Sequence, residues 1–190
     1  MQKLIFATSS PHKLGELRDL LPAYNVLGLE DIGYRHEIDE NGATLEENAL
    51  IKANTLFGHL HEVSLGEDTG LEVFALDMAP GVYTARYAGN DRDPVKNMEK
   101  LLSALKGSTD RRARFRTVIA MVGANGSRLF EGIVNGHISD HIAGDGGFGY
   151  DPVFIPEGYK MTFAELPRDV KNSISHRAMA VANLVSYFNK

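Results

Sequence analysis

The sequence predicts an α/β fold, in which a mixed central sheet is flanked by helices and two lobes lie around an active-site cleft. Short apolar segments alternate with amphipathic ones early in the chain, and a hairpin signal follows later. Early alternation of strands and helices followed by a hairpin is typical of such a sheet. No repeat, low-complexity tract or linker interrupts the 190 residues, so we expect one domain over residues 1–190.

The first elements in the chain are predicted as a strand, a polar turn and a helix. The apolar run within Met1–Ala7 is too short for a signal peptide or a membrane-spanning helix, and Leu4–Thr8 fits a buried strand. The leucines of Lys13–Leu21 then fall on one helical stripe, which Pro22 ends. This order aims the free N–H groups of a helix start at whatever lies above the strand.

The next stretch predicts a second helix. Residues 25–43 are irregular in pattern and hold several acids, which favours a loop. Thr44 and Glu47 then fit a capping box, and small and apolar residues from Leu45 to Leu56 recur on one face.

A turn, a strand and a helix are predicted next. Glu67–Gly70 is polar and ends in glycine, so we expect a turn before a strand over Leu71–Leu76. Asp93 is a typical N-cap, proline follows it, and Val95–Leu105 is predicted to complete the helix.

The last third of the chain predicts a hairpin and a terminal helix. Arg114–Val122 and Arg128–Ile138 are predicted as two strands joined at Asn125-Gly126. A helix is expected from about Ser175 to about Phe188. Its inward-facing residues are predicted to be Ala178, Ala182 and Val185.

The composition excludes several classes of site and partner. The chain has no cysteine, which excludes disulfides and thiolate zinc sites and fits a reducing, cytoplasmic environment. Its formal net charge of −5 argues against the broad positive surface that nucleic-acid duplexes require, and no segment predicts membrane insertion. A small polyanion remains a possible ligand where a metal and a few lysines supply positive charge locally.

Two segments contain residues suited to phosphate binding. Thr8–Lys13 places hydroxyls, N–H groups and a lysine at a strand-to-helix turn, although a helix cap with a surface lysine explains it equally simply. It lacks the glycine spacing of a Walker A loop. Asn48 and Lys52 share one helix face, and Glu47 beside them fits either a cap or a metal ligand.

Adjacent acids at Glu67 and Asp68 suggest a hard-cation site. Carboxylates are the ligands that Mg²⁺ prefers, and Asp68 is also a candidate to accept a proton from an attacking water. A solvated acidic turn is the alternative interpretation.

Two later segments suggest a base-binding loop and a cationic helix start. Gly146–Pro152 combines glycines with two aromatic residues, which suits stacking on a base, or a tight connection with aromatic core anchors. Lys171, His176 and Arg177 place positive charge beside the expected start of the last helix, where the helix dipole disfavours it. A bound anion would relieve this conflict, whereas a solvated cap is the alternative.

Together these segments resemble the inosine triphosphate pyrophosphatase family, also called Ham1-like, over essentially the whole chain and in the family's order. The matching segments are Ala7–Lys13, Glu46–Ala53, Glu67–Leu71, Pro80–Gly89, Gly147–Phe154 and Lys171–Arg177. The chain departs from the family at Ser9-Ser10, where a Gly-Asn pair is usual, and at Glu67, where an aspartate is frequent. The Ser-Ser-Pro start is also similar to the Maf pyrophosphatases, but the later motifs are not.

The resemblance implies a cytoplasmic, homodimeric, Mg²⁺-dependent hydrolase that converts ITP, dITP and XTP to the monophosphate and pyrophosphate. It implies that Asp68 activates water, that Glu47 and Asp68 hold Mg²⁺, and that Arg177 and His176 donate to the 6-oxo group of the base. The implied substrate-binding residues are Thr8, Ser9, Ser10, Lys13, Lys52, Thr69, Phe148, Gly149, Tyr150, Asp151, Lys171, His176 and Arg177. The alternatives are a Maf-like pyrophosphatase, a nucleotide sensor without turnover and a nucleic-acid-binding module.

Overall fold

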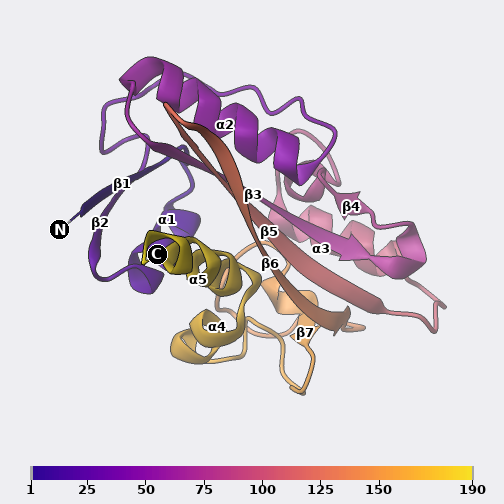
Figure 1. Cartoon of the computed structure of the whole chain (residues 1–190). Coiled ribbons are helices and arrows are strands. Elements are labelled where there is room, and N and C mark those ends of the chain that lie inside the picture. Colours follow the sequence, from indigo (N-terminus) through magenta and orange to yellow (C-terminus); the bar gives the residue numbers. More distant parts are fainter. Residues whose placement is uncertain (1, 190) are drawn as a thin grey trace. The chain divides into compact units, whose positions relative to one another are not determined.

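The protein, described here by a computed structural model that covers residues 2–189, contains one mixed sheet of seven strands and five α-helices (Figure 1). The strands are β1 (Gln2–Phe6), β2 (Tyr24–Leu27), β3 (Ser64–Val73), β4 (Pro80–Gly81), β5 (Arg112–Gly123), β6 (Gly126–Ile138) and β7 (Phe154–Pro156). The helices are α1 (Pro11–Leu20), α2 (Leu45–Leu60), α3 (Pro94–Ala104), α4 (Arg168–Ile174) and α5 (His176–Phe188).

The strand pairing confirms a mixed α/β sheet. The order along the sheet is β2-β1-β3-β5-β6-β7, and β4 pairs with β3. β1 pairs in parallel with β2 and β3, whereas β4 and β7 pair antiparallel with β3 and β6. The hairpin at Asn125-Gly126 forms as predicted, with Gly126 at a φ of 106° that suits glycine.

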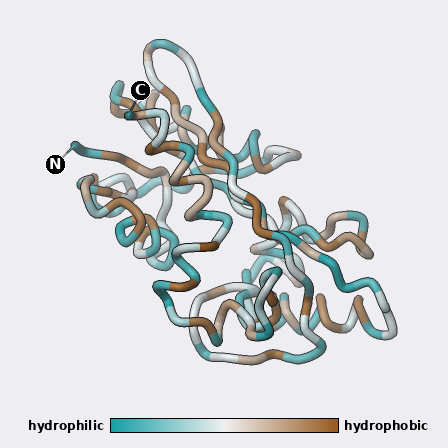
Figure 2. Tube along the Cα trace, turned by 60° about the horizontal axis from the view of Figure 1, so that its bottom comes forward, coloured by the Kyte–Doolittle hydropathy of each residue, from teal (hydrophilic) through white to brown (hydrophobic). Residues whose placement is uncertain are grey.

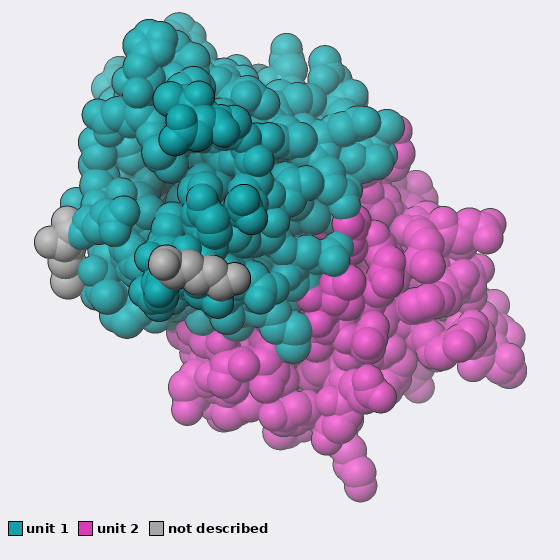
Figure 3. Space-filling view, in the orientation of Figure 1, with its two compact units in different colours: residues 1–68, 117–132, 176–190 teal, residues 69–116, 133–175 magenta. Residues whose placement is uncertain are grey.

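The chain divides into two compact units (Figure 3). Unit 1 comprises residues 1–68, 117–132 and 176–190, and unit 2 comprises residues 69–116 and 133–175. Figure 2 shows that hydrophobic residues are distributed in short stretches along the elements. Within residues 2–189, no helix is both long and apolar enough to cross a membrane.

The core of unit 1 lies between strand residues and helices α1 and α5. Its buried side chains include Leu4, Phe6, Leu17, Leu65, Ile119, Phe130 and Leu184. α2 packs so closely on β3 that a Cβ on Gly66 would lie 2.1 Å from Ala49 O. This close approach brings the polar residues of α2 next to those of β3.

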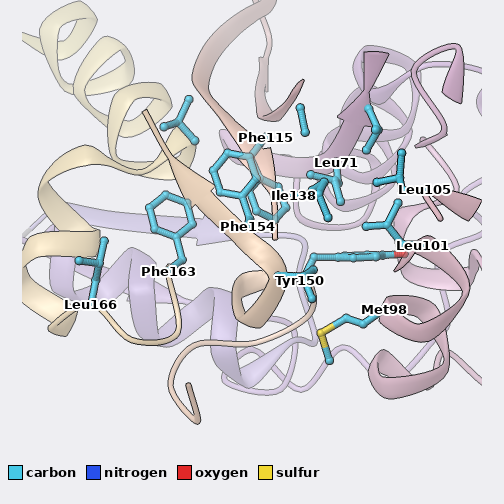
Figure 4. Close-up of a cluster of buried hydrophobic side chains, with 14 residues drawn as sticks. Leu71, Met98, Leu101, Leu105, Phe115, Ile138, Tyr150, Phe154, Phe163 and Leu166 are labelled. Carbon is cyan, nitrogen blue, oxygen red and sulfur yellow. The ribbon is translucent and has the colours of Figure 1, made fainter. Parts of the chain in front are cut away.

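The core of unit 2 is rich in aromatic residues (Figure 4). The rings of Phe115 and Phe154 have centroids 4.7 Å apart, and those of Phe154 and Phe163 lie 5.3 Å apart. Leu71 from β3 and Leu101 from α3 are fully buried in the same cluster. The segment around Gly146–Pro152 is therefore anchored to this aromatic core, to which Tyr150 belongs.

Four predictions about elements were wrong. Leu71–Leu76 is not a strand throughout, because β3 ends at Val73 and Phe74–Leu76 forms a 3-10 helix. Residues 25–43 are not irregular throughout, because Tyr24–Leu27 forms β2, whose pairing with β1 is non-local and whose only buried residue is Val26. Glu67–Gly70 is not a turn but the middle of β3. In α5, Ala182 is exposed, and the buried face is instead formed by His176, Arg177, Ala180, Val181 and Leu184.

Candidate active site

The polar turn after β1 forms the start of α1, as predicted. Ser10 is the N-cap, and its Oγ accepts from Lys13 N at 3.4 Å. Thr8 Oγ1 accepts from Ser10 N at 3.2 Å, so the first hydroxyl of the turn fixes the backbone of the third. Ser9 between them is exposed. The turn therefore places hydroxyls and N–H groups at a helix N-terminus, where an anion is favoured.

Asp68 is a buried carboxylate held by two residues of α2. Its Oδ1 lies 3.1 Å from Lys52 Nζ, and its Oδ2 accepts from Asn48 Nδ2 at 3.3 Å. Asn48 and Lys52 occupy one face of α2, as their spacing predicted, and both are buried. The close packing at Gly66 brings this face to the strand. The structure thus brings Asp68 of β3 together with Asn48 and Lys52 of α2, whereas the sequence did not predict that the strand and the helix meet here.

Glu40 is a second carboxylate at Lys52, and sequence reasoning missed it. Its Oε2 lies 2.8 Å from Lys52 Nζ, so one ammonium bridges Glu40 and Asp68. Burial lowers the pKa of Lys52, but the carboxylates of Asp68 and Glu40 outweigh burial and raise this pKa above its ordinary value. Lys52 therefore stays charged. Glu40 stands among other acids in an irregular segment, and no periodicity singles it out.

Glu47 forms the first half of the predicted capping box, but its side chain accepts from the residue before the N-cap. Thr44 Oγ1 accepts from Glu47 N at 3.1 Å, and Glu47 Oε2 accepts from Ala43 N at 2.6 Å. The side chain is exposed. Next to it, Asn48 Oδ1 accepts from Gly42 N at 2.8 Å, so the loop before α2 is tied to the helix at two points. A role for Glu47 in metal binding stays a prediction.

Arg177 lies fully buried in unit 1 between two carboxylates. Its Nη2 lies 2.7 Å and its Nε 3.1 Å from Glu67 Oε1, and its Nη1 pairs with Glu16. Burial lowers the pKa of the guanidinium, but Glu67 and Glu16 outweigh burial and raise it. The sequence assigned Arg177 to a base pocket, whereas this structure directs its donors to carboxylates inside unit 1. Glu16 was not predicted, because it sits on a helix turn between leucines and looks like a surface residue.

Lys13 lies near Glu67, and its surroundings disfavour the charged ammonium form. Its Nζ is 3.6 Å from Glu67 Oε1, and 19% of its side-chain surface is exposed. Burial is the main cause that lowers its pKa, the cations Lys52 and Arg177 add to the effect, and Glu67 opposes it. An additional negative charge nearby would favour the ammonium form.

His176 opens α5 next to Arg177 and is buried. A Cβ on Gly132 of β6 would lie only 2.0 Å from His176 O, so the start of α5 packs directly on the strand. Thr69, in contrast, follows Asp68 in β3 and is half-buried. The sequence grouped His176 and Arg177 with Lys171, but the structure assigns Lys171 to unit 2.

Lys171 and Asp151 form a buried ion pair within unit 2. Lys171 Nζ lies 2.6 Å from Asp151 Oδ2, and the side chains are 6% and 4% exposed. Asp151 Oδ2 also accepts from Phe148 N at 2.8 Å. Gly149 adopts a φ of 63°, which lets the loop turn back on itself.

Tyr150 is an anchor of the unit 2 core. It is only 3% exposed, and its hydroxyl donates to Thr84 O at 3.0 Å. Burial raises the pKa of this phenol. Of the two aromatic residues in the predicted base-binding loop, Tyr150 thus fixes the loop, while Phe148 is partly exposed.

Two carboxylates, Glu40 and Asp68, contact Lys52 Nζ. Within residues 2–189, no group of three or more His, Asp or Glu side chains gathers to hold a metal by itself. Mg²⁺ commonly binds through one or two carboxylates together with water and substrate phosphates. Asp68 and Glu40 are carboxylates of that kind, and the Lys52 ammonium contacts both of them.

Comparisons with known proteins agree with the motif order. The model of the Ham1 family matches residues 4–187. A dITP/XTP pyrophosphatase of Porphyromonas gingivalis is 50% identical over 186 residues, which cover 97% of this chain and 96% of that protein. One of Staphylococcus aureus is 39% identical over 188 residues, covering 98% of this chain and 96% of that protein.

Solved structures support the same relationship. The structure of the Staphylococcus aureus Ham1 protein has a TM-score of 0.90 and 38% identity, with 99% of this chain and 98% of that chain covered. A HAM1 protein from Coxiella burnetii has a TM-score of 0.90 and 34% identity, with 100% and 99% covered. From its motifs, its fold and these full-length relatives, the chain belongs to the Ham1 family.

Proposed function

We propose that this protein is a nucleoside-triphosphate pyrophosphatase that hydrolyses ITP, dITP and XTP to the monophosphate and pyrophosphate, and so removes non-standard purines from the nucleotide pool. The observation that carries the proposal is full-length similarity to Ham1-family relatives named dITP/XTP pyrophosphatase. The buried Asp68, held between Lys52 and Asn48, supplies a suitable reactive group.

Asp68 is proposed as the group that orients and deprotonates the attacking water. Lys52 Nζ contacts one oxygen of this carboxylate, and a positioned carboxylate can accept a proton from water as a general base. Asn48 fixes the second carboxylate oxygen. With both oxygens held by α2, the carboxylate is kept in one orientation, and positioning of this kind is a large part of phosphoryl-transfer catalysis.

Lys13, Lys52 and the turn Thr8–Ser10 are proposed to bind the phosphates. The lowered pKa of Lys13 reflects a buried ammonium with too little negative charge around it. A phosphate would supply that charge, while the N-terminus of α1 and its hydroxyls supply neutral donors. Part of the binding energy would then come from the phosphate charge, which offsets the unfavourable burial of the Lys13 ammonium in the free enzyme.

Mg²⁺ is proposed as the cofactor, held by Asp68 with Glu47 or Glu40 as the second carboxylate. Both candidates already have a partner, since Glu40 contacts Lys52 and Glu47 accepts from the backbone of Ala43. When bound, the cation neutralises phosphate charge and stabilises the pyrophosphate leaving group.

The enzyme is proposed to recognise the base through its 6-oxo group, which hypoxanthine and xanthine carry and adenine lacks. By family resemblance, Phe148 stacks on the base, and Arg177 and His176 donate to its 6-oxo group. The other substrate-binding residues that the resemblance implies are Thr69, Gly149, Tyr150, Asp151 and Lys171. A donor-rich pocket leaves donors unpaired against adenine, and such mismatches give discrimination on the order of 10⁴.

The proposal also includes a cytoplasmic homodimer, as the family resemblance implies. Light scattering is expected to give a mass near twice the 20.9 kDa of the chain. A monomer at working concentration would contradict the assembly and leave the chemistry unaffected.

Product analysis tests the proposed reaction. The protein is incubated with ITP in Mg²⁺ and, separately, in EDTA, and the products are resolved by ion-exchange chromatography. We expect IMP and pyrophosphate in equal amounts with Mg²⁺ and no turnover in EDTA. Release of orthophosphate and IDP would contradict cleavage at the α-phosphorus, and full turnover in EDTA would contradict the metal site. Greater turnover of modified pyrimidine nucleotides or 7-methyl-GTP would favour a Maf-like activity.

A further inference from the structure

The ion pair between Lys171 and Asp151 fixes more than its own two side chains. Asp151 Oδ2 receives Lys171 Nζ at 2.6 Å and, on the same oxygen, the N–H of Phe148 at 2.8 Å. Gly147 passes so close that a Cβ there would lie 2.1 Å from this oxygen, and its φ of +67° is one that glycine adopts freely. The carboxylate therefore holds the backbone of residues 147–148 from one side.

Lys171 also contacts this loop through the aromatic ring of Phe148. Its Nζ lies 5.2 Å from the centroid of the Phe148 ring and 5.8 Å from that of Phe163. Phe163 is 1% exposed, and its ring lies 5.3 Å from that of Phe154 in the unit 2 core. A cation within about 6 Å of a ring centroid attracts the ring face, and more strongly where water is excluded. One buried ammonium thus connects Phe148 to the core.

The charge of Lys171 is already used inside unit 2. Both members of the pair are almost fully buried, and a buried ammonium requires a close anion and further polar partners to offset its loss of hydration. Asp151 is that anion, and it is itself fixed by a second hydrogen bond. This arrangement suits a structural clamp.

We propose that Lys171 and Asp151 are positioning residues that hold Phe148, backbone and ring, in the orientation that binds the base. The link to the base rests on the proposed function, whereas the clamp on Phe148 does not. Lys171 then acts through Phe148 and not on the phosphates, and its loss weakens substrate binding without a direct effect on the chemical step.

The chain provides a clean probe, because it has no tryptophan. Phe148→Trp introduces a single indole at the ring in question, and its anisotropy and its quenching by acrylamide report how firmly the ring is held. This parent variant is compared with one that also carries Lys171→Met and Asp151→Asn. Changing both members avoids an uncompensated buried charge, and asparagine retains an oxygen that can accept from residue 148 N–H.

Glu72→Gln together with Arg114→Met in the same parent is the matched control, because it also removes both members of a pair. Glu72 also forms a largely buried ion pair in unit 2, with Glu72 Oε2 2.5 Å from Arg114 Nε. Its loss therefore tests the general effect of removing an ion pair from this unit. All variants are first checked for a cooperative thermal transition by circular dichroism.

We expect the pair variant to show lower indole anisotropy and stronger acrylamide quenching than the parent, and the control to match the parent. Unchanged anisotropy and quenching in the folded pair variant would overturn the clamp. A measurement on the unaltered protein covers the case in which the pair variant does not fold: the Phe148 amide proton should exchange at least roughly tenfold more slowly than its intrinsic rate. Unprotected exchange at Phe148 would equally overturn the proposal.

Steady-state kinetics then separate the clamp from the proposed function. If Phe148 binds the base, the pair variant in the wild-type Phe148 background should raise KM for ITP roughly tenfold while kcat stays within about threefold, since uniform binding is lost. Lower indole anisotropy and stronger quenching in the pair variant, with an unchanged KM, would support the clamp and refute base binding by Phe148. A roughly tenfold fall in kcat at unchanged KM would overturn the positioning role, because it would indicate an action in the chemical step.

Discussion

Lys52 Nζ lies 3.1 Å from Asp68 Oδ1, although one residue belongs to the middle of α2 and the other to the middle of β3. The contact exists because Gly66 lets the helix backbone approach the strand. The contact places the Lys52 ammonium against Asp68, the carboxylate that we assign to water activation. The acidic neighbours of Lys52 raise its pKa.

Replacing Asp68 with asparagine should abolish most of the turnover while the fold survives. Asparagine keeps the shape and one acceptor for Lys52 but loses the proton-accepting carboxylate, so kcat for ITP should fall at least roughly 10²-fold. The measurement is kcat together with the thermal transition. Glu62→Gln, which removes an exposed carboxylate paired with Lys3 at 2.6 Å, is the control and should behave as wild type. Near-normal kcat in folded Asp68→Asn would show that another group is the base.

Removing the charge of Lys13 should stabilise the free enzyme. The pKa of Lys13 lies below its ordinary value of 10.5, mainly because of burial. A lysine with a lowered pKa costs stability at every pH below the lowered value, and this cost fades as the pH rises towards the ordinary value. At pH 7 the ammonium is therefore unfavourable to folding.

Lys13→Met is accordingly expected to raise Tm at pH 7 by a few degrees and to increase KM for ITP. The gain in Tm over wild type should shrink as the pH rises towards the ordinary pKa of 10.5, above which the penalty on wild-type Lys13 is gone. Lys3→Met, which alters an exposed lysine, serves as the control and should leave KM unchanged. A lower Tm in Lys13→Met at pH 7 would contradict the electrostatic argument.

Arg177→Ala should be strongly destabilising, because it leaves Glu16 and Glu67 as buried carboxylates without their main cation. Loss of one partner from a buried ion network typically costs about 3–5 kcal/mol. Chemical denaturation measures this cost. The matched variant Arg177→Met with Glu16→Gln and Glu67→Gln removes all three charges and should recover most of the stability. A folded Arg177→Ala protein of wild-type stability that loses only ITP over ATP preference would instead support the predicted base-reading role.

Gly66→Ala should displace α2 from β3. A methyl group there would lie 2.1 Å from Ala49 O and 2.7 Å from Ala53 N, and both are backbone atoms that cannot rotate away. Overpacking of this kind commonly costs about 1–3 kcal/mol. We expect a lower Tm and a fall in kcat, since Asn48 and Lys52 move with the helix. Gly58→Ala on α2, where a Cβ meets no atom within 4 Å, is the control and should keep kcat.

Local chemistry predicted the elements whose signals are local. The caps at Thr44 and Asp93, the proline after Asp93 and the Asn125-Gly126 turn each act over a few residues, and all are found where they were expected. The helix face shared by Asn48 and Lys52 was predictable for the same reason.

Non-local pairing explains what the sequence could not predict. β2 depends on its register with β1, and four residues with one buried valine carry too little pattern to reveal it. Glu67 and Asp68 look like a solvated turn because their neutralising partners, Arg177 and Lys52, come from α5 and α2. Glu40 and Glu16 likewise became candidates only through the cations that they contact.

The most direct test of the central claim is kcat/KM of the wild-type protein for ITP, dITP, XTP, ATP and GTP, measured side by side as pyrophosphate release in Mg²⁺. We expect ITP, dITP and XTP to exceed ATP by at least roughly 10²-fold, because adenine presents a donor where the 6-oxo purines present an acceptor. Comparable kcat/KM values for ATP and ITP, with pyrophosphate as the product, would contradict a role in removing non-standard purines.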